Sequence, residues 1–189
     1  MRSNTRKALF IDIDGVIIYD PGYLSDVNEI MFLPGVLESL CKARCHGYYL
    51  VFISNKGGVY SKKGFTDMEL RKMDKYISSK LIENHISEKS FSTYYCTHYP
   101  PQLCSCRKPL SGLFEKAVAE HGIETNKSFA IGDKLSDLIP GDTIGCKLGI
   151  LVKRNQEYFD DQSETSDNFP RLNSLSDAIN FILKQNDNQ

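Results

Sequence analysis

The 189-residue sequence lacks an excess of either charge. It contains 23 lysine and arginine residues against 24 aspartate and glutamate residues, and its formal net charge at pH 7 is -1. Proteins that bind polynucleotides or anionic lipids non-specifically usually carry a strong basic field. The charge balance therefore argues against nucleic acid and membrane surfaces as partners.

The sequence also lacks an apolar run of the length that a membrane span needs, and residues 1–6 lack the apolar core of a secretory signal. We therefore expect a cytoplasmic protein, in which the six cysteines are thiols or metal ligands before they are disulfides. The length and the 41% content of hydrophobic residues are those of an ordinary globular domain. We expect residues 1–189 to form a single domain and the chain to be a monomer.

Apolar segments alternate with helical patterns along the chain. Short aliphatic and aromatic runs predict strands at residues 7–13, 48–53, 90–96, 128–131 and 147–152. Helical spacing, caps and glycine stops predict helices at about residues 34–46, 66–84, 111–121, 132–145 and 174–185. This alternation predicts an α/β fold, a doubly wound parallel sheet with helices on both faces. Residues 155–167 are polar and without periodicity, which predicts a solvated loop.

Two carboxylates, Asp12 and Asp14, follow the first apolar run, and Gly15 comes directly after them. Side chains alternate along a strand, so the two carboxylates start on the same side, and Gly15 allows a sharp turn behind them. Like charges so close are costly unless a cation lies between them, and oxygen ligands favour magnesium. The alternative is two solvated acids at the end of a strand.

Other polar residues fall at the ends of later predicted strands. Ser54 and Asn55 follow the second, Lys108 follows the cysteine-rich segment after the third, and Asp133 follows the fourth. Ligands of open α/β sheets bind at this edge. A nucleophilic carboxylate, a second carboxyl group, a hydroxyl, a lysine and a further carboxylate suit phosphoryl transfer through an aspartyl-phosphate. Alone, Ser54 would be an ordinary turn hydroxyl and Lys108 a solvated lysine.

The ordered set D-x-D-G, Ser-Asn, Lys and G-D-x-x-x-D resembles the four motifs of the haloacid dehalogenase superfamily of phosphatases. The resemblance implies that Asp12 attacks phosphorus and that Asp14 is the general acid and base. It also implies that Ser54 and Lys108 hold the phosphoryl oxygens. Asp12, the backbone carbonyl of Asp14, and Asp133 would bind Mg²⁺, with Asp137 supporting the site or starting a helix.

A second cluster, Cys96, His98, Cys104 and Cys106, lies within eleven residues. Three thiolates and an imidazole make a closed tetrahedral zinc site without an open position for a reacting water, so Zn²⁺ there would be structural. The metal would clip a segment with little apolar content and fix Arg107 and Lys108. The alternative is a chance cluster of three thiols and a histidine.

The run C-x-H-x₅-C-x-C-R-K-P resembles two groups within that superfamily, the heptose bisphosphate phosphatases and the histidinol-phosphate phosphatases. The first implies removal of the C7 phosphate of D-glycero-D-manno-heptose 1,7-bisphosphate, in nucleotide-activated heptose and lipopolysaccharide core biosynthesis. These relatives lack a large cap domain. The resemblance implies substrate contacts for five residues: Asp20, Tyr23, Asn55, Arg107 and Lys134.

The sequence departs from these groups at Ile13, where an arginine is usual, and at residues 56–64, where the glycine-rich segment is longer and richer in lysine. These departures bear on the substrate and leave the phosphoryl-transfer residues intact. A histidinol-phosphate phosphatase is therefore the alternative of the same class. The alternative of another class is a zinc-knuckle binding module on an inactive scaffold.

Overall fold

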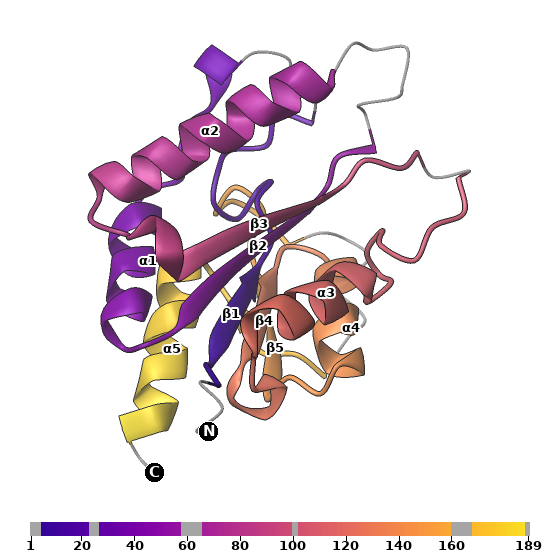
Figure 1. Cartoon of the computed structure of the whole chain (residues 1–189). Helices are drawn as coiled ribbons and strands as arrows, with labels where there is room; N and C mark the ends of the chain where they lie inside the picture. Colours follow the sequence, from indigo (N-terminus) through magenta and orange to yellow (C-terminus); the bar gives the residue numbers. More distant parts are fainter. Residues whose placement is uncertain (1–4, 23–26, 58–65, 100–101, 160–167, 188–189) are drawn as a thin grey trace.

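The computed structural model describes residues 5–22, 27–57, 66–99, 102–159 and 168–187. Six strands form one parallel sheet in the order β3-β2-β1-β4-β5-β6 (Figure 1). The strands are β1 (Ala8–Ile11), β2 (Tyr49–Asn55), β3 (Phe91–Cys96), β4 (Phe129–Gly132), β5 (Leu148–Val152) and β6 (Arg171–Leu172). The longer helices are α1 (Val36–Cys45), α2 (Asp67–Glu83), α3 (Gly112–His121), α4 (Leu135–Thr143) and α5 (Leu175–Asp187).

Alternating side chains of the central strand divide the core into two layers. Leu9 and Ile11 pack in one cluster with residues of α1, α2 and α5, whereas Ala8 and Phe10 pack in the other with residues of α3 and α4. Phe10 stacks on Phe114 of α3 with ring centroids 4.9 Å apart. β1 is thus buried on both faces, as expected for a central parallel strand. The predicted doubly wound α/β fold is confirmed (Figure 1).

Local signals place the element ends close to their predicted positions. The Thr66 hydroxyl accepts from the backbone N–H of Glu69, and the Glu69 carboxylate accepts from the backbone N–H of Thr66, so the predicted capping box starts α2. α3 ends at Gly122, which adopts a left-handed conformation with φ 62°. β2 continues two residues beyond its predicted end, so Ser54 and Asn55 belong to the strand itself.

Two features differ from the sequence prediction. The short edge strand β6 was not predicted, because two residues are too few to show an alternating pattern. The prediction of a solvated loop is wrong at its first residue, since Asn155 is only 8% exposed. Asn155 is buried because its amide hydrogen-bonds the backbone of Asp20 at both ends. Residues 160–167 of the same predicted loop lie outside the described residues.

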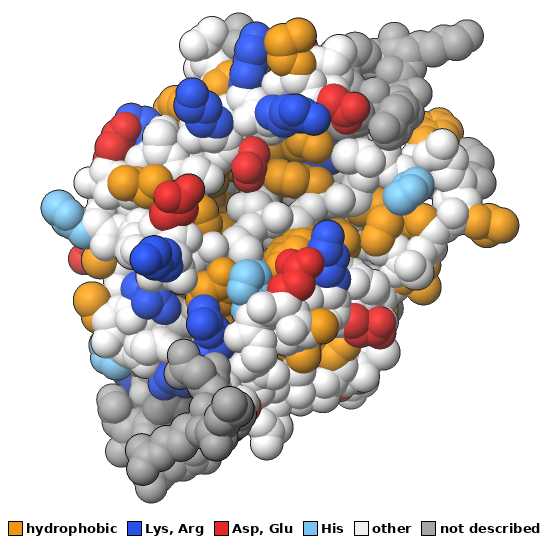
Figure 2. Space-filling model, in the orientation of Figure 1, with side chains coloured by type: hydrophobic (Ala, Val, Ile, Leu, Met, Phe, Trp, Pro, Cys, Tyr) orange, Lys and Arg blue, Asp and Glu red, His pale blue; other side chains and the backbone are white. Residues whose placement is uncertain are grey.

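The surface matches the balanced composition. Figure 2 shows basic and acidic side chains interspersed over the face in view. Within the described part of the chain, none of the helices combines the length and the apolar character that crossing a membrane requires.

Candidate active site

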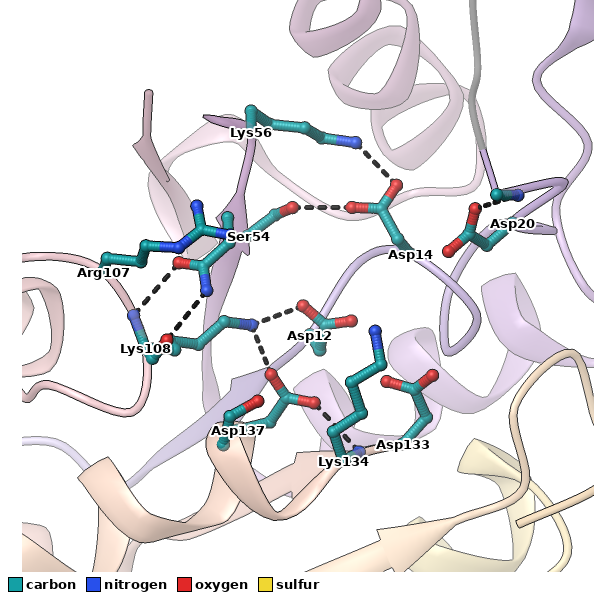
Figure 3. A pocket seen from close by; sticks show the side chains of 13 residues that line it. Asp12, Asp14, Asp20, Ser54, Lys56, Arg107, Lys108, Asp133, Lys134 and Asp137 are labelled. Carbon is teal, nitrogen blue, oxygen red and sulfur yellow. Dashed lines mark hydrogen bonds and ion pairs between the residues drawn. The ribbon is translucent and has the colours of Figure 1, made fainter. Parts of the chain in front are cut away.

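A pocket of about 400 Å³ lies at the carboxyl edge of the sheet (Figure 3). Asp12 directly follows β1, Asp133 directly follows β4, and Ser54 and Asn55 end β2. Its lining residues are Asp12, Asp14, Asp20, Gly22, Ser54, Asn55, Lys56, Arg107, Lys108, Asp133, Lys134, Ser136 and Asp137. The structure therefore brings together all the predicted catalytic, substrate and magnesium residues except Tyr23, which lies outside the described residues.

Lys108 lies at the centre of this arrangement and is 4% exposed. Its ammonium is 2.5 Å from Asp12 Oδ1 and 2.7 Å from Asp137 Oδ1, and it donates to the carbonyl of Ile53 at 2.7 Å. Although burial opposes it, the two carboxylates raise the pKa of Lys108 above its usual value. Lys108 is thus a buried cation, and the alternative of a solvated surface lysine is wrong.

Three buried carboxylates form a cluster beside this cation, and two of them, Asp12 and Asp137, contact it. Oxygen atoms of Asp12, Asp133 and Asp137 lie within 4.8 Å of one another. Burial raises the pKa of Asp12 to about 7, against the opposing effect of Lys108. Burial, together with the charges of Asp12 and Asp137, raises the pKa of Asp133 to about 8. Raised carboxyl pKa values indicate a cluster with too little positive charge, so its oxygen donors fit a divalent cation.

Asp137 differs from the other two carboxylates because both its oxygens have protein partners. Oδ1 pairs with Lys108, and Oδ2 accepts from the backbone N–H of Lys134 at the start of α4. A Cβ on Gly132 would come within 2.2 Å of Asp137 Cβ, so only glycine fits beneath this side chain. These contacts support the expectation that Asp137 supports the site or starts a helix, since one oxygen pairs with Lys108 and the other accepts from the backbone at the start of α4.

Asp14 lies apart from these three carboxylates, on the side of Ser54 and Lys56 (Figure 3). Its Oδ2 accepts from the Ser54 hydroxyl at 2.6 Å and its Oδ1 pairs with Lys56 at 2.6 Å. Burial opposes ionisation, but Lys56 and Ser54 together hold the pKa of Asp14 below its usual value. In this arrangement Asp14 is a carboxylate, the form that accepts a proton.

Asn55 holds the backbone of Lys108. Its side-chain oxygen accepts from the Lys108 N–H at 3.0 Å, and its Nδ2 donates to the Lys108 carbonyl at 3.0 Å. Asn55 lines the pocket as predicted, yet both ends of its amide are engaged by the protein. It therefore positions Lys108 over a sequence separation of 53 residues.

The cysteine and histidine side chains of residues 96–106 converge on one point. Cys96 Sγ lies 3.2 Å from Cys106 Sγ and 3.9 Å from Cys104 Sγ, and His98 Nδ1 lies 3.1 Å from Cys106 Sγ. Two sulfur atoms bound at about 2.3 Å to one tetrahedral zinc lie roughly 3.8 Å apart. The four donors all lie within 4.8 Å of one another, so their chemistry and spacing fit one closed zinc site.

Arg107 connects this cluster to the pocket. Its Nη1 donates to the backbone carbonyl of His98 at 3.2 Å, and the residue lines the pocket. A Cβ on Gly57 would lie 2.8 Å from both Arg107 Nη1 and the His98 oxygen, so this approach requires glycine. The segment 96–106 thus determines where the Arg107 guanidinium lies.

Sequence reasoning missed the contacts of two residues after β5. Arg154 donates through Nη1 to Asp133 Oδ2 at 3.2 Å and pairs through Nη2 with Asp20. Asn155 donates its backbone N–H to the Gly15 carbonyl at 2.8 Å and its side chain holds Asp20. One signal was available, because Arg154 is a charged residue just beyond a strand end at the ligand-binding edge.

Known proteins resemble this chain over nearly all its length. The sequence model of the HAD-hydrolase-like family matches residues 105–178. D-glycero-beta-D-manno-heptose-1,7-bisphosphate 7-phosphatase of Haemophilus ducreyi is 31% identical over 183 residues, covering 94% of this chain and 98% of the relative. The enzyme of that name from Helicobacter pylori strain 26695 is 36% identical over 152 residues, covering 80% of this chain and 87% of the relative.

A solved structure shares the fold. The crystal structure of D,D-heptose 1,7-bisphosphate phosphatase from B. bronchiseptica, in complex with magnesium and phosphate, superposes with a TM-score of 0.82. The match covers 95% of this chain and 99% of that chain at 22% sequence identity.

The two hydrogen bonds between the Asn55 side chain and the Lys108 backbone give a prediction about stability. Asn55→Ala removes two hydrogen bonds to the backbone of Lys108 and leaves its buried groups unpaired, which is expected to lower the free energy of unfolding by about 2 to 4 kcal/mol. Asn84→Ala is the control, because the Asn84 side chain makes one bond, to the Lys80 carbonyl at 2.9 Å at the end of α2. Denaturant unfolding of the two variants measures the difference. Equal losses in both would contradict the positioning role of Asn55.

Proposed function

Because the chain belongs to the haloacid dehalogenase-like hydrolases and is a phosphatase, we propose that it removes the C7 phosphate of D-glycero-β-D-manno-heptose 1,7-bisphosphate through an aspartyl-phosphate. The observation that carries the proposal is the pocket in which Asp12 lies 2.5 Å from the ammonium of Lys108. Relatives named D-glycero-beta-D-manno-heptose-1,7-bisphosphate 7-phosphatase are about 30% identical over most of the chain, and they support the choice of substrate.

Asp12 is the proposed nucleophile. One of its oxygens attacks phosphorus, an O–P bond forms, and the bond from phosphorus to the C7 oxygen breaks in line. Lys108 fixes the Asp12 carboxylate through Oδ1 and is the buried positive charge nearest to it. Lys108 and the Ser54 hydroxyl would hold the phosphoryl oxygens, where the negative charge of the transition state lies.

Asp14 is the proposed general acid and base. The leaving C7 alkoxide takes a proton from the carboxylic acid of Asp14, and the resulting carboxylate then accepts a proton from the water that hydrolyses the aspartyl-phosphate. The contacts with Ser54 and Lys56 favour the carboxylate, so the structure corresponds to the form that accepts this proton. Protonation of Asp14 for the first step requires its pairing with Lys56 to loosen.

The proposed magnesium ligands are Asp12, the backbone carbonyl of Asp14, and Asp133. Their oxygen chemistry fits, because the carboxylate cluster is short of positive charge and Asp137 is engaged by Lys108 and α4. Bound magnesium supplies positive charge that offsets the charge on the phosphoryl oxygens. The magnesium and phosphate bound in the crystal structure from B. bronchiseptica support this assignment.

The proposed zinc ligands are Cys96, His98, Cys104 and Cys106. Four protein donors leave no open position for a reacting water, so a zinc ion here supports the fold of the segment and takes no part in the reaction. Its effect on the pocket passes through the carbonyl of His98, which holds Arg107. Structural zinc is thus proposed to position a substrate-binding arginine.

A bisphosphate needs a second cationic locus for the phosphate that it retains. Arg107, Lys56 and Lys134 line the pocket outside the pair formed by Asp12 and Lys108, and we assign them to the C1 phosphate. Histidinol phosphate carries a cationic amine, which these side chains repel. Asp20 and Tyr23 are proposed to bind sugar hydroxyls, with part of the Asp20 carboxylate engaged by Arg154.

The remaining proposals concern the setting of the reaction. We propose a small sugar phosphate as the only class of partner, a single domain over residues 1–189, a monomeric state and a cytoplasmic location. The resemblance implies that a large cap domain is lacking, so we propose that loops close over the substrate. The product would be heptose 1-phosphate, whose anomeric phosphate suits activation by a nucleotide.

Replacement of the nucleophile tests the mechanism. Asp12→Asn keeps the side-chain volume and still accepts from Lys108, but it removes the nucleophile, and turnover is expected to fall by at least about a thousandfold. Initial rates at saturating magnesium and the denaturation midpoint are measured together. Asp142→Asn, on the exposed side of α4, is the control and is expected to keep wild-type turnover. Retention of more than a few per cent of activity by a folded Asp12→Asn protein would falsify the aspartyl-phosphate mechanism.

Replacement of one thiol tests the zinc assignment. Cys104→Ser is expected to lower zinc affinity by about 10- to 100-fold or more, because a serine hydroxyl is a poor ligand. Elemental analysis after purification without chelators should find one zinc per wild-type chain and less in this variant, with reduced turnover as Arg107 loses its support. Cys45→Ser is the control, since Cys45 is exposed on α1 outside the cluster. A wild-type protein in which elemental analysis finds no zinc would contradict this assignment.

Removal of Arg107 tests the second phosphate site. Arg107→Ala is expected to lower kcat/KM for the heptose 1,7-bisphosphate by more than about tenfold, the loss of one charge-assisted contact. A heptose 7-monophosphate, which lacks the C1 phosphate, should lose several-fold less. Arg71→Ala, on the exposed face of α2, is the control. Equal losses for the two substrates would remove Arg107 from the C1 phosphate site.

A further inference from the structure

Arg154 carries a half-buried guanidinium that contacts two carboxylates, and it is absent from the pocket wall among the described residues. Its side chain is 14% exposed, and Asp133, which it holds through Oδ2, is 1% exposed. The second carboxylate belongs to Asp20, on the loop after β1. Arg154 therefore contacts the proposed magnesium ligand from outside the set of residues that line the pocket.

The surrounding backbone fixes this guanidinium in place. Gly15 has φ +85°, and a Cβ there would lie 2.9 Å from Arg154 Cγ and 3.0 Å from Asp133 Oδ2. Only glycine leaves room for the arginine stem and the carboxylate together. Asn155, with φ 51°, bonds the Gly15 carbonyl and both backbone groups of Asp20. The turn after β5 and the loop after β1 are thus joined by hydrogen bonds around Arg154.

The contact with Arg154 makes the two carboxylate oxygens of Asp133 inequivalent. Because Oδ2 accepts from Arg154 and so has one lone pair engaged, Oδ1 is the oxygen better placed to bind a metal ion. A carboxylate restricted to one oxygen suits Mg²⁺, which takes near-octahedral sites with one oxygen from each carboxylate. Ca²⁺ prefers seven or eight ligands and often gains them from bidentate carboxylates.

We propose that Arg154 is a positioning residue that makes the site selective for Mg²⁺ over Ca²⁺, by occupying one oxygen of Asp133. This inference rests on the magnesium site of the proposed function. Loss of Arg154 frees the second oxygen, and Ca²⁺ gains more from it than Mg²⁺ does. The loss of a positive charge strengthens the binding of any divalent cation, but it acts equally on two ions of the same charge. The ratio of the two affinities therefore isolates the effect of the freed oxygen.

The test compares Mg²⁺ and Ca²⁺ binding by isothermal titration calorimetry, without substrate, on full-length protein that keeps its zinc and is dialysed free of magnesium. Arg154→Met removes the guanidinium and keeps the aliphatic stem. Arg154→Gln gives the same comparison should the methionine variant fail to fold. Arg154→Lys keeps the charge and one donor group. Arg71→Met is the matched control, because it makes the same substitution on the exposed face of α2, away from Asp133.

The wild-type protein should bind Mg²⁺ in preference to Ca²⁺. In Arg154→Met the affinity ratio should move towards Ca²⁺ by about tenfold or more, the size of effect expected of a residue that orients a metal ligand. The ratio of Arg154→Lys should lie closer to wild type, and that of Arg71→Met should stay within about threefold of the wild-type ratio. An unchanged ratio in Arg154→Met and Arg154→Gln, with Mg²⁺ binding intact, overturns this inference alone. Wild-type protein that binds neither ion, or an Asp133→Asn variant that binds both normally, overturns the magnesium site of the proposed function as well.

Discussion

The ammonium of Lys108, buried between Asp12 and Asp137, is the interaction on which the geometry of the site depends. Burying an ion costs several kcal/mol unless partners replace its water. Here two carboxylates and the Ile53 carbonyl do so. The chain segments that carry these partners are far apart in sequence. This contact can therefore form only once β1, β2 and α4 have packed together. The same contact therefore ties the fold to the chemistry.

The other features of the site follow from the crowding of negative charge around that lysine. Lys108 does not contact all three of Asp12, Asp133 and Asp137, and burial together with the repulsion between these carboxylates raises the pKa of Asp12 and of Asp133. The individual oxygen atoms of these carboxylates have different partners within the protein. Asp137 uses both oxygens within the protein, Asp133 shares one with Arg154, and Asp14 is drawn aside by Ser54 and Lys56. The remaining uncompensated negative charge lies around Asp12 and Asp133, where the magnesium ion and the phosphoryl group are proposed to bind.

The sequence pattern predicted this site where the signal was local. Asp12 follows an apolar run, Ser54 and Asn55 end another, and the edge of a parallel sheet brings such residues together. Pairings across long separations were not predictable in this way. The amide of Asn55 was expected at the substrate, yet it holds Lys108, and Arg154 binds Asp20 across 134 residues. Asn155 was placed in a solvated loop because polarity is a property of the segment, whereas burial is set by its distant partner. The strand β6 was missed because two residues carry no period.

The central claim is that this phosphatase acts on one particular phosphate of a heptose bisphosphate. Phosphorus NMR of D-glycero-β-D-manno-heptose 1,7-bisphosphate during turnover tests it most directly, because the C1 and C7 phosphates give separate signals. The C7 signal should be replaced by that of inorganic phosphate, while the C1 signal persists through complete conversion. Loss of the C1 phosphate, or no conversion by an enzyme preparation that hydrolyses histidinol phosphate, would contradict it.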